Sequence, residues 1–428
     1  MIIEFSVTNF RSIAGTQVFS LNASKIKGLD ECTFKVDAAG QFQLLRSAAI
    51  YGANAAGKSN FMRAVRAMHD IVLNSASDSQ SGDSLPVSAF KLNPELVKSP
   101  SEFEIVFIID GVRYQYGFSA SHEMIYEEWL FAYPKGRPQR WFARAWNESE
   151  QVYDWDMGNS LLGEKQVWQK ATRANALFLS TAVQLNSSQL KPIFNWFRRT
   201  LRMSNVGGWN HDYSASLCTG ERKEEILDFL KAADIGIDDV HVKKEKFDVN
   251  KLPKEFPDSL KEVVMESFKD RNRYEISMFH RGSDDQLIGF DFDEESDGTR
   301  KLFSFSGPWI DSLSKGYVLF IDELHDNLHP TLVKFLVGLF NNPKTNPKGA
   351  QLIFTTHETS ILNQDVFRRD QVWFCEKGFD GATKIFPLTD FSPRKGRENL
   401  EVSYLDGRYG AIPSISDIKG VKDINHGD

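Results

Sequence analysis

Residues 52–59 read Gly-Ala-Asn-Ala-Ala-Gly-Lys-Ser and complete the pattern G-x-x-x-x-G-K-[ST]. An apolar run at 47–51 leads into this stretch and a helix-forming run at 60–68 leaves it, which is the strand–loop–helix setting that the pattern requires. Glycine permits backbone angles that a Cβ would resist, so successive N–H groups can point inward at phosphate oxygens. The stretch therefore predicts a phosphate loop that binds a nucleoside triphosphate.

Each residue type in this loop has a chemical task. The ammonium of Lys58 suits the β- and γ-phosphates, the hydroxyl of Ser59 suits Mg²⁺, and the helix that follows adds its positive dipole end. The residues expected to contact ATP here are Gly52, Asn54, Ala55, Ala56, Gly57, Lys58, Ser59 and Asn60. A glycine-rich turn that only happens to carry Lys-Ser is the alternative, and the motifs below disfavour it.

The composition is that of an ordinary globular protein. Its 428 residues are 41% hydrophobic, enough for a substantial core divided between two lobes. The net charge of −7 argues against a general nucleic-acid coat, although not against a local basic face. Three widely separated cysteines without a C-x-x-C predict neither a disulfide framework nor a zinc knuckle. No apolar stretch approaches the roughly 20 residues of a membrane span, so we expect a cytoplasmic protein with no membrane partner.

Four segments are expected along the chain. Residues 1–150 form the first ATPase half, with the phosphate loop and an antiparallel β meander whose clearest hairpin signal is Asp110-Gly111. Residues 151–288 form an inserted helical lobe for a trigger or partner, 289–413 form the second ATPase half, and 414–428 form a flexible tail.

The insertion carries a basic and aromatic segment that includes Arg198 and Arg199. Helical patterns are found at 166–178, 188–203, 223–233 and 257–269. The two arginines are expected on the second of these helices, where they are a candidate contact for nucleic acid or a protein partner. A solvated helix face is the alternative interpretation.

The acidic pair Asp322-Glu323 follows the apolar strand 317–321 in the second α/β run. In an open α/β sheet, the carboxyl end of such a strand lies beside the phosphate loop. Asp322 is expected to hold the magnesium shell, and Glu323 to polarise the attacking water as a general base. A strand that simply ends in acidic residues is the alternative.

Three further elements separate ABC-type ATPases from other phosphate-loop proteins, and one of them is the stretch Leu324–Pro330 after the acidic pair. Glu295–Lys301 opens a helix in which Ser296 is the expected N-cap and Gly298 lets the backbone approach a ligand. This stretch resembles the signature motif, which in such ATPases meets the γ-phosphate held by a partner subunit. The buried strand 351–356 ends at His357, which suits a residue that contacts the γ-phosphate and reports its hydrolysis.

In combination, these motifs resemble the RecF/SMC-like ABC ATPases. Within them the chain is most similar to the bacterial AAA-ATPase-like group linked to abortive infection and phage defence, and to overcoming-lysogenization-defect ATPase domains without a Toprim nuclease. The stretches that carry the resemblance are Asn9–Ser12, the phosphate loop, Glu295–Arg300, Ile321–Leu324, Leu328–Pro330, Thr355–His357 and Gly407–Pro413. They cover roughly the two ends of the chain. The group often has an acidic or small residue where His325 stands.

This resemblance implies an α/β P-loop NTPase of ABC type that uses ATP and Mg²⁺. It implies that Arg11 and Ser12 lie near the nucleotide and that His357 is the switch histidine, which acts with Lys58 and Glu323 in hydrolysis. It also implies an assembly of at least two copies of the chain that controls a separately encoded toxic effector in anti-phage defence. The alternatives are a DNA-repair clamp that binds nucleic acid, and an ATP-bound scaffold that sequesters a toxin without hydrolysis.

Overall fold

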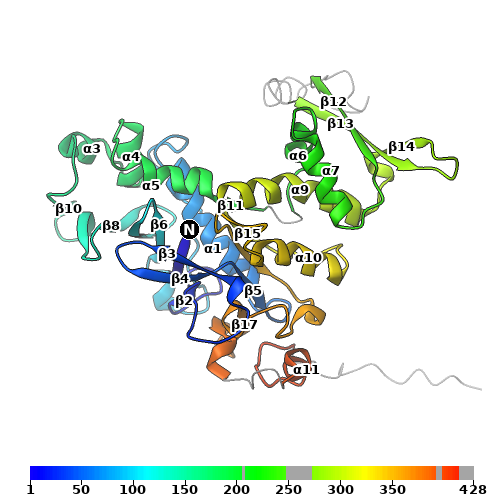
Figure 1. Cartoon of the computed structure of the whole chain (residues 1–428). Helices are drawn as coiled ribbons and strands as arrows, with labels where there is room; N and C mark the ends of the chain where they lie inside the picture. Colours follow the sequence, from blue (N-terminus) through cyan, green and yellow to red (C-terminus); the bar gives the residue numbers. More distant parts are fainter. Residues whose placement is uncertain (205–207, 247–271, 392–397, 414–428) are drawn as a thin grey trace, which may run out of the picture.

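Two β-sheets with a long helix between them form the centre of the molecule (Figure 1). The computed structural model describes residues 1–204, 208–246, 272–391 and 398–413. The larger sheet is antiparallel, with the strand order β10-β9-β8-β7-β6-β1-β2. Its strands are β1 (Ile2–Thr8), β2 (Gln17–Ser20), β6 (Ser101–Ile109), β7 (Val112–Ala120), β8 (Ile125–Tyr133), β9 (Gln139–Asn147) and β10 (Val152–Met157).

The predicted meander is confirmed as strands β6 to β9 of this sheet. Asp110 and Gly111 have φ of 46° and 74°, and Ile109 pairs with Val112 on either side of them. Two successive residues with positive φ match the twist of antiparallel strands, so this dipeptide forms the expected two-residue hairpin.

The second sheet is parallel apart from its last pair and has the order β11-β15-β16-β5-β17-β18. Its strands are β5 (Ser47–Tyr51), β11 (Leu201–Met203), β15 (Val318–Ile321), β16 (Gln351–Thr355), β17 (Val372–Lys377) and β18 (Thr383–Pro387). The strand that leads into the phosphate loop is therefore internal, and its carboxyl end lies beside those of β16 and β17. This α/β architecture with added antiparallel strands confirms the predicted fold class.

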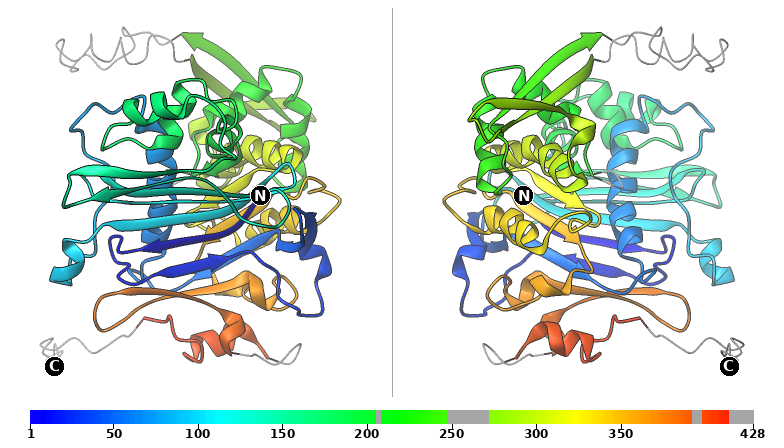
Figure 2. Two further views of the ribbon diagram at one scale, coloured as in Figure 1. Left: turned by 90° about the vertical axis from the view of Figure 1, so that its left-hand side faces the viewer. Right: turned by 90° about the vertical axis from the view of Figure 1, so that its right-hand side faces the viewer.

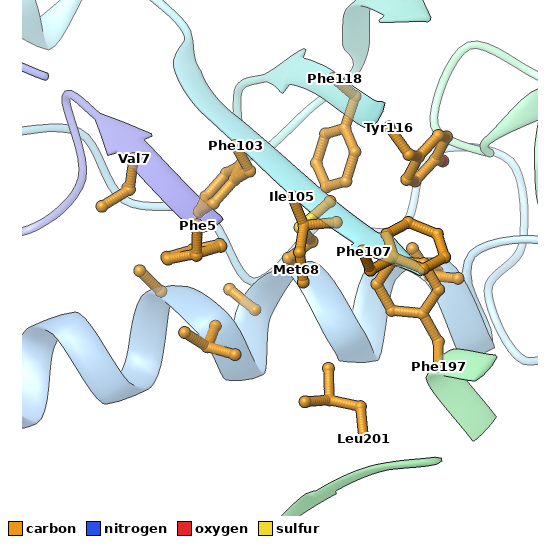
Figure 3. Close-up of a cluster of buried hydrophobic side chains, with 14 of the residues drawn as sticks. Phe5, Val7, Met68, Phe103, Ile105, Phe107, Tyr116, Phe118, Phe197 and Leu201 are labelled. Carbon is orange, nitrogen blue, oxygen red and sulfur yellow. The ribbon is translucent and has the colours of Figure 1, made fainter. Parts of the chain in front are cut away.

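Alternate residues of the parallel strands face two different cores, because successive side chains point to opposite sides of a sheet. Ile50 and Ile353 belong to the core around α1 (Lys58–Asn74), which fills the space below the antiparallel sheet. Figure 3 shows this core, with Met68 of α1 beneath Ile105 of β6. Tyr51 and its neighbours on the other face instead pack against the helices that follow in the sequence.

The remaining elements lie around these two sheets (Figure 2). The helices are α2 (Pro94–Val97), α3 (Lys165–Ala171), α4 (Phe178–Gln184), α5 (Lys191–Asn195), α6 (Asp212–Cys218), α7 (Lys223–Ala232), α9 (Asp297–Lys315), α10 (Pro330–Asn341) and α11 (Leu400–Leu405). The additional strands are β3 (Thr33–Asp37), β4 (Gln41–Leu45), β12 (Asp239–Lys246), β13 (Asn272–Arg281) and β14 (Leu287–Asp291). In the described parts of the chain, none of these helices combines the length and apolar character of a membrane span.

The helical expectation for the insertion is wrong in three places. The helix expected over 166–178 ends at Ala171, and a new helix, α4, begins only at Phe178. The helix expected over 188–203 ends early: α5 passes into a π-helical turn at Trp196–Thr200, and Leu201–Met203 becomes strand β11 at the edge of the parallel sheet. The pairing with β15 makes these residues a strand. Three residues are too few to show a strand period, so the sequence could not predict it. The sequence analysis also did not predict the antiparallel sheet β12-β13-β14. The helix expected at 257–269 lies outside the described residues.

Candidate functional site

The phosphate loop joins β5 to α1 at the carboxyl edge of the parallel sheet. Ala55 and Gly57 have φ of 62° and 114°, the left-handed conformation that turns successive backbone N–H groups toward one side. A Cβ on Gly57 would lie 2.1 Å from the hydroxyl oxygen of Thr383, so only glycine fits this close approach. Thr383 in turn donates a hydrogen bond to the carbonyl of Ala56 at 2.9 Å, which fixes the loop against β18.

Lys58 lies folded over the loop with its side chain buried. Its Nζ donates to the carbonyl oxygens of Gly52 and Ala53 at 2.7 and 3.1 Å. Burial lowers the pKa of Lys58, and the carboxylates of Glu323 and Asp322 partly oppose that shift. The ammonium of Lys58 therefore lies within electrostatic range of both carboxylates of the predicted acidic pair.

Asp322 and Glu323 follow β15, and both form hydrogen bonds with Thr355 at the end of β16. The Thr355 hydroxyl donates to the carboxylate of Asp322 at 2.6 Å and accepts the backbone N–H of Glu323 at 2.8 Å. Glu323 has a φ of 56° and is exposed, so the chain turns sharply and presents its carboxylate to solvent. Sequence reasoning missed Thr355, which was noted only as part of a motif.

His357 lies two residues beyond β16 and contacts His325, from the turn that follows β15. Their Nε2 atoms are 2.9 Å apart and their ring centroids 3.8 Å apart. His357 is exposed, whereas His325 is half-buried. The sequence predicted a role for His357 but no partner for it.

Arg11 and Ser12 reach the loop from the turn after β1. Ser12 Oγ accepts a hydrogen bond from the side chain of Asn60 at 2.7 Å and lies 2.8 Å from the hydroxyl of Thr383. Arg11 lines a cavity of about 300 Å³ together with Ser12, Asn60, Lys91 and Lys377. This cavity has a basic lining and lies beside Asn60, the residue that follows the phosphate loop.

Ser296 caps α9 and accepts the backbone N–H of Thr299 at 3.1 Å, which is the N-cap geometry that the sequence indicated. A Cβ on Gly298 would lie 3.0 Å from the carbonyl of Asn327, and Lys301 donates to the carbonyl of Asp326. The start of α9 is therefore joined to the turn after β15. Among the described residues, no hydrogen bond joins Ser296 or Gly298 to the phosphate loop of the same chain.

The C-terminal part of the described chain contacts the phosphate loop directly. The backbone N–H of Ala53 donates to the carbonyl of Ala411 at 2.8 Å, and the hydroxyl of Tyr404 donates to the same carbonyl at 3.0 Å. Tyr404 is buried and stacks on Phe374 with 5.3 Å between ring centroids. Figure 1 shows α11, which carries Tyr404, below the parallel sheet. The segment Gly407–Pro413 was noted in the sequence, but its contact with the loop was not foreseen.

Comparison with known proteins identifies a family. The model of the family described as "AAA domain, putative AbiEii toxin, Type IV TA system" matches residues 47–363, which is more than half of the chain and spans the phosphate loop, the acidic pair and His357. No curated protein matches this sequence.

Solved structures also match over most of this chain. The SMC head domain from Thermotoga maritima is 12% identical, with 90% of this chain and 98% of that chain covered and a TM-score of 0.40. A crystal structure of an SmcHead bound to the C-winged helix domain of ScpA is 14% identical, with 90% and 97% covered and a TM-score of 0.38.

Proposed function

This chain belongs to the family described as AAA domain, putative AbiEii toxin, Type IV TA system, and from that membership we propose that it binds and hydrolyses ATP as a subunit of a bacterial anti-phage defence system of the abortive-infection type. Two copies of the chain would close around composite nucleotide sites and so control a separately encoded toxic effector. The word "toxin" in the family description supports a link to growth arrest, and the chain's own chemistry supports the ATPase.

The observation that carries the proposal is the arrangement of Lys58, Asp322 and Glu323 around one edge of the parallel sheet. These side chains come from the ends of β5 and β15, and Thr355 of the intervening strand β16 bonds to both acidic residues. Ligands bind at this edge in open α/β sheets. An ion pair with a purely structural role would not explain why the Glu323 carboxylate is exposed, or why a loop of inward-pointing N–H groups lies at the same edge.

The residues present fit ATP and Mg²⁺. The loop backbone and Lys58 would hold the phosphates, while the hydroxyl of Ser59 and the carboxylate of Asp322 offer the oxygen ligands that Mg²⁺ prefers. Glu323 would accept a proton from the attacking water, and His357 would donate to a terminal phosphate oxygen. The basic lining of the cavity beside Asn60, which includes Arg11 and Lys91, would contribute positive charge near the nucleotide.

The composite dimer rests on the position of α9. Gly298 and Lys301, at the start of the helix that Ser296 caps, contact the turn at 323–328. Ser296 and Gly298 would therefore contact the nucleotide bound to a second copy. The same residues of that copy would contact the nucleotide bound to this one. ATP would then favour the closed dimer to the extent that it binds this state more tightly than the open one.

The segment 151–288, between the two proposed ATPase halves, would contact the trigger or the effector. Arg198 and Arg199 are both exposed on the π-helical turn, where a partner or nucleic acid could reach them. Replacing both with alanine should weaken such binding and leave nucleotide binding unchanged. The division of the chain into segments that end at residues 150, 288 and 413 is part of this proposal.

The test compares the wild type with Glu323→Gln and Lys58→Ala. Glu323→Gln should keep ATP binding, lose about a hundredfold or more in phosphate release, and accumulate as an ATP-bound dimer in light scattering. Lys58→Ala should lose ATP binding and remain monomeric. If Glu323→Gln hydrolyses ATP at the wild-type rate, the catalytic assignment is wrong. Strong stimulation by double-stranded DNA that fades with salt would instead favour the repair clamp.

A further inference from the structure

The contact between His325 and His357 is unusual because both partners are imidazoles. Their Nε2 atoms are 2.9 Å apart, with 72° between the ring planes. A neutral imidazole has one N–H and one acceptor nitrogen, so this bond requires the N–H of one ring to face the lone pair of the other. The proton arrangement of one histidine therefore dictates that of its neighbour.

The buried nitrogen of His325 determines which ring donates. Its Nδ1 is buried and has no hydrogen-bond partner among the described residues. Burial lowers the pKa of His325 to about 4, and His357 and Lys301 act in the same direction, while Asp326 and Glu358 oppose it. His325 is thus neutral near pH 7 and carries one proton.

A proton on Nδ1 of His325 would be a buried donor without an acceptor, which is rarer and costlier in proteins than an unused acceptor. The proton therefore belongs on Nε2, where it bonds to Nε2 of His357. His357 must then use Nε2 as an acceptor and keep its own proton on Nδ1.

We propose that His325 is a positioning residue that fixes the ring and the tautomer of His357, so that His357 offers its Nδ1–H to an anionic oxygen. This inference rests on the proposed function, in which that oxygen belongs to the terminal phosphate. The second nitrogen of a histidine commonly receives such an orienting bond, and the bond sets which nitrogen carries the proton. His325 touches neither nucleotide nor water in this proposal and acts only through its neighbour.

Two variants separate the hydrogen bond from packing. His325→Leu keeps an apolar side chain in the half-buried position but removes the donor, whereas His325→Gln keeps an N–H that can reach His357. We expect kcat for ATP hydrolysis to fall by up to about tenfold in His325→Leu, the value of one net hydrogen bond, with KM for ATP little changed. His325→Gln should recover most of the loss.

The direct readout is the tautomer of each histidine, measured by two-bond ¹H–¹⁵N NMR correlation in the full chain at pH 7. His122→Leu, which removes an exposed histidine of the β7–β8 turn, provides an assignment and activity control. In the wild type we expect His325 protonated on Nε2 and His357 on Nδ1, and in His325→Leu we expect His357 to become a tautomer mixture. A wild-type His357 that carries its proton on Nε2, or one whose tautomer is the same in His325→Leu, would overturn the inference.

The proposed ATPase function and the proposed role of His325 can be disproved independently. If neither wild type nor any variant hydrolyses ATP, the proposed function is wrong, but the NMR measurement still decides whether His325 controls His357. If hydrolysis is normal and depends on Glu323, an unchanged His357 tautomer removes only the role of His325.

Discussion

At the residue scale, Thr355 shows how little of a site's geometry can be visible in a sequence. Its hydroxyl joins the carboxylate of Asp322 to the backbone of Glu323, and the side chain is fully buried. A threonine at the end of an apolar strand is common, since β-branched residues suit strands. Its task exists only because β16 lies next to β15 in the sheet.

A second feature at this scale is the buried pair of Glu128 and Arg144, whose side chains are both inaccessible to solvent. Glu128 accepts the backbone N–H groups of Phe178 and Leu179, and so it caps α4 from a neighbouring strand. Burial raises the pKa of Glu128, while Arg144 and these N–H groups act against that rise. The pair fixes α4 onto the antiparallel sheet.

We predict that Glu128→Gln lowers the free energy of unfolding by about 3–5 kcal/mol, because the buried guanidinium of Arg144 loses its counter-charge. Urea denaturation measures this. The matched control is Glu127→Gln at the exposed neighbouring position, which should change stability by less than about 0.5 kcal/mol. Equal effects of the two variants would show that the buried pair is not what holds α4.

At the element scale, the segment from α11 to Ala411 acts as a support for the phosphate loop. Ala53 is bonded to Ala411, and Tyr404 both donates to Ala411 and stacks on Phe374 of β17. Ala411 has a φ of 59°, a conformation that costs a non-glycine residue energy and is kept only where surrounding contacts demand it. The loop is therefore fixed by residues more than 340 positions away in the chain.

We predict that Tyr404→Ala increases hydrogen exchange at the amide of Ala53, because the carbonyl that holds this N–H loses its own support. Removing a buried aromatic ring costs about 3–5 kcal/mol, so the segment should detach well before the core unfolds. Exchange measured by mass spectrometry on peptides covering 50–58 tests this, with β6 and β7 as the internal reference. Val402→Ala, at an exposed position of the same helix, is the control. Uniform exchange changes across both regions would contradict local support.

At the scale of the whole molecule, the proposed distribution of the site between two copies makes a complementation experiment possible. Lys58→Ala disables the phosphate loop, and Gly298→Asp places a carboxylate where a Cβ already approaches the carbonyl of Asn327 at 3.0 Å. Each variant alone should be nearly inactive. Each mixed dimer, however, has one site with an intact loop from one copy and an intact α9 from the other.

We predict that an equal mixture of these two variants recovers up to about half of the wild-type ATPase rate, since Lys58→Ala forms no dimer with itself and each mixed dimer has one of two sites intact. Phosphate release after exchange of subunits measures it. The control mixture is Lys58→Ala with Glu323→Gln. Both of these residues serve the same copy's site, so no mixed dimer has an intact one. The same rate in both mixtures would rule out composite sites.

The local motifs were determined by the sequence itself. The loop at 52–59, the acidic pair after β15, the cap of α9 at Ser296 and the hairpin at Asp110 each depend on residues that are neighbours in the chain. Their conformations follow from glycine angles, capping and strand period, which act over a few residues. The sequence could therefore predict the α/β sheet and the local geometry of the motifs at its edge.

Only the tertiary structure decided which distant residues complete that edge. Strand β11, the hydroxyls of Thr355 and Thr383, the support from Ala411 and the bond between His325 and His357 all join segments that are far apart in the chain. Single polar side chains carry no period, and a hydrogen bond across strands depends on strand order, which local propensity does not encode. The long-range contacts of folding therefore determine how the predicted catalytic groups are held.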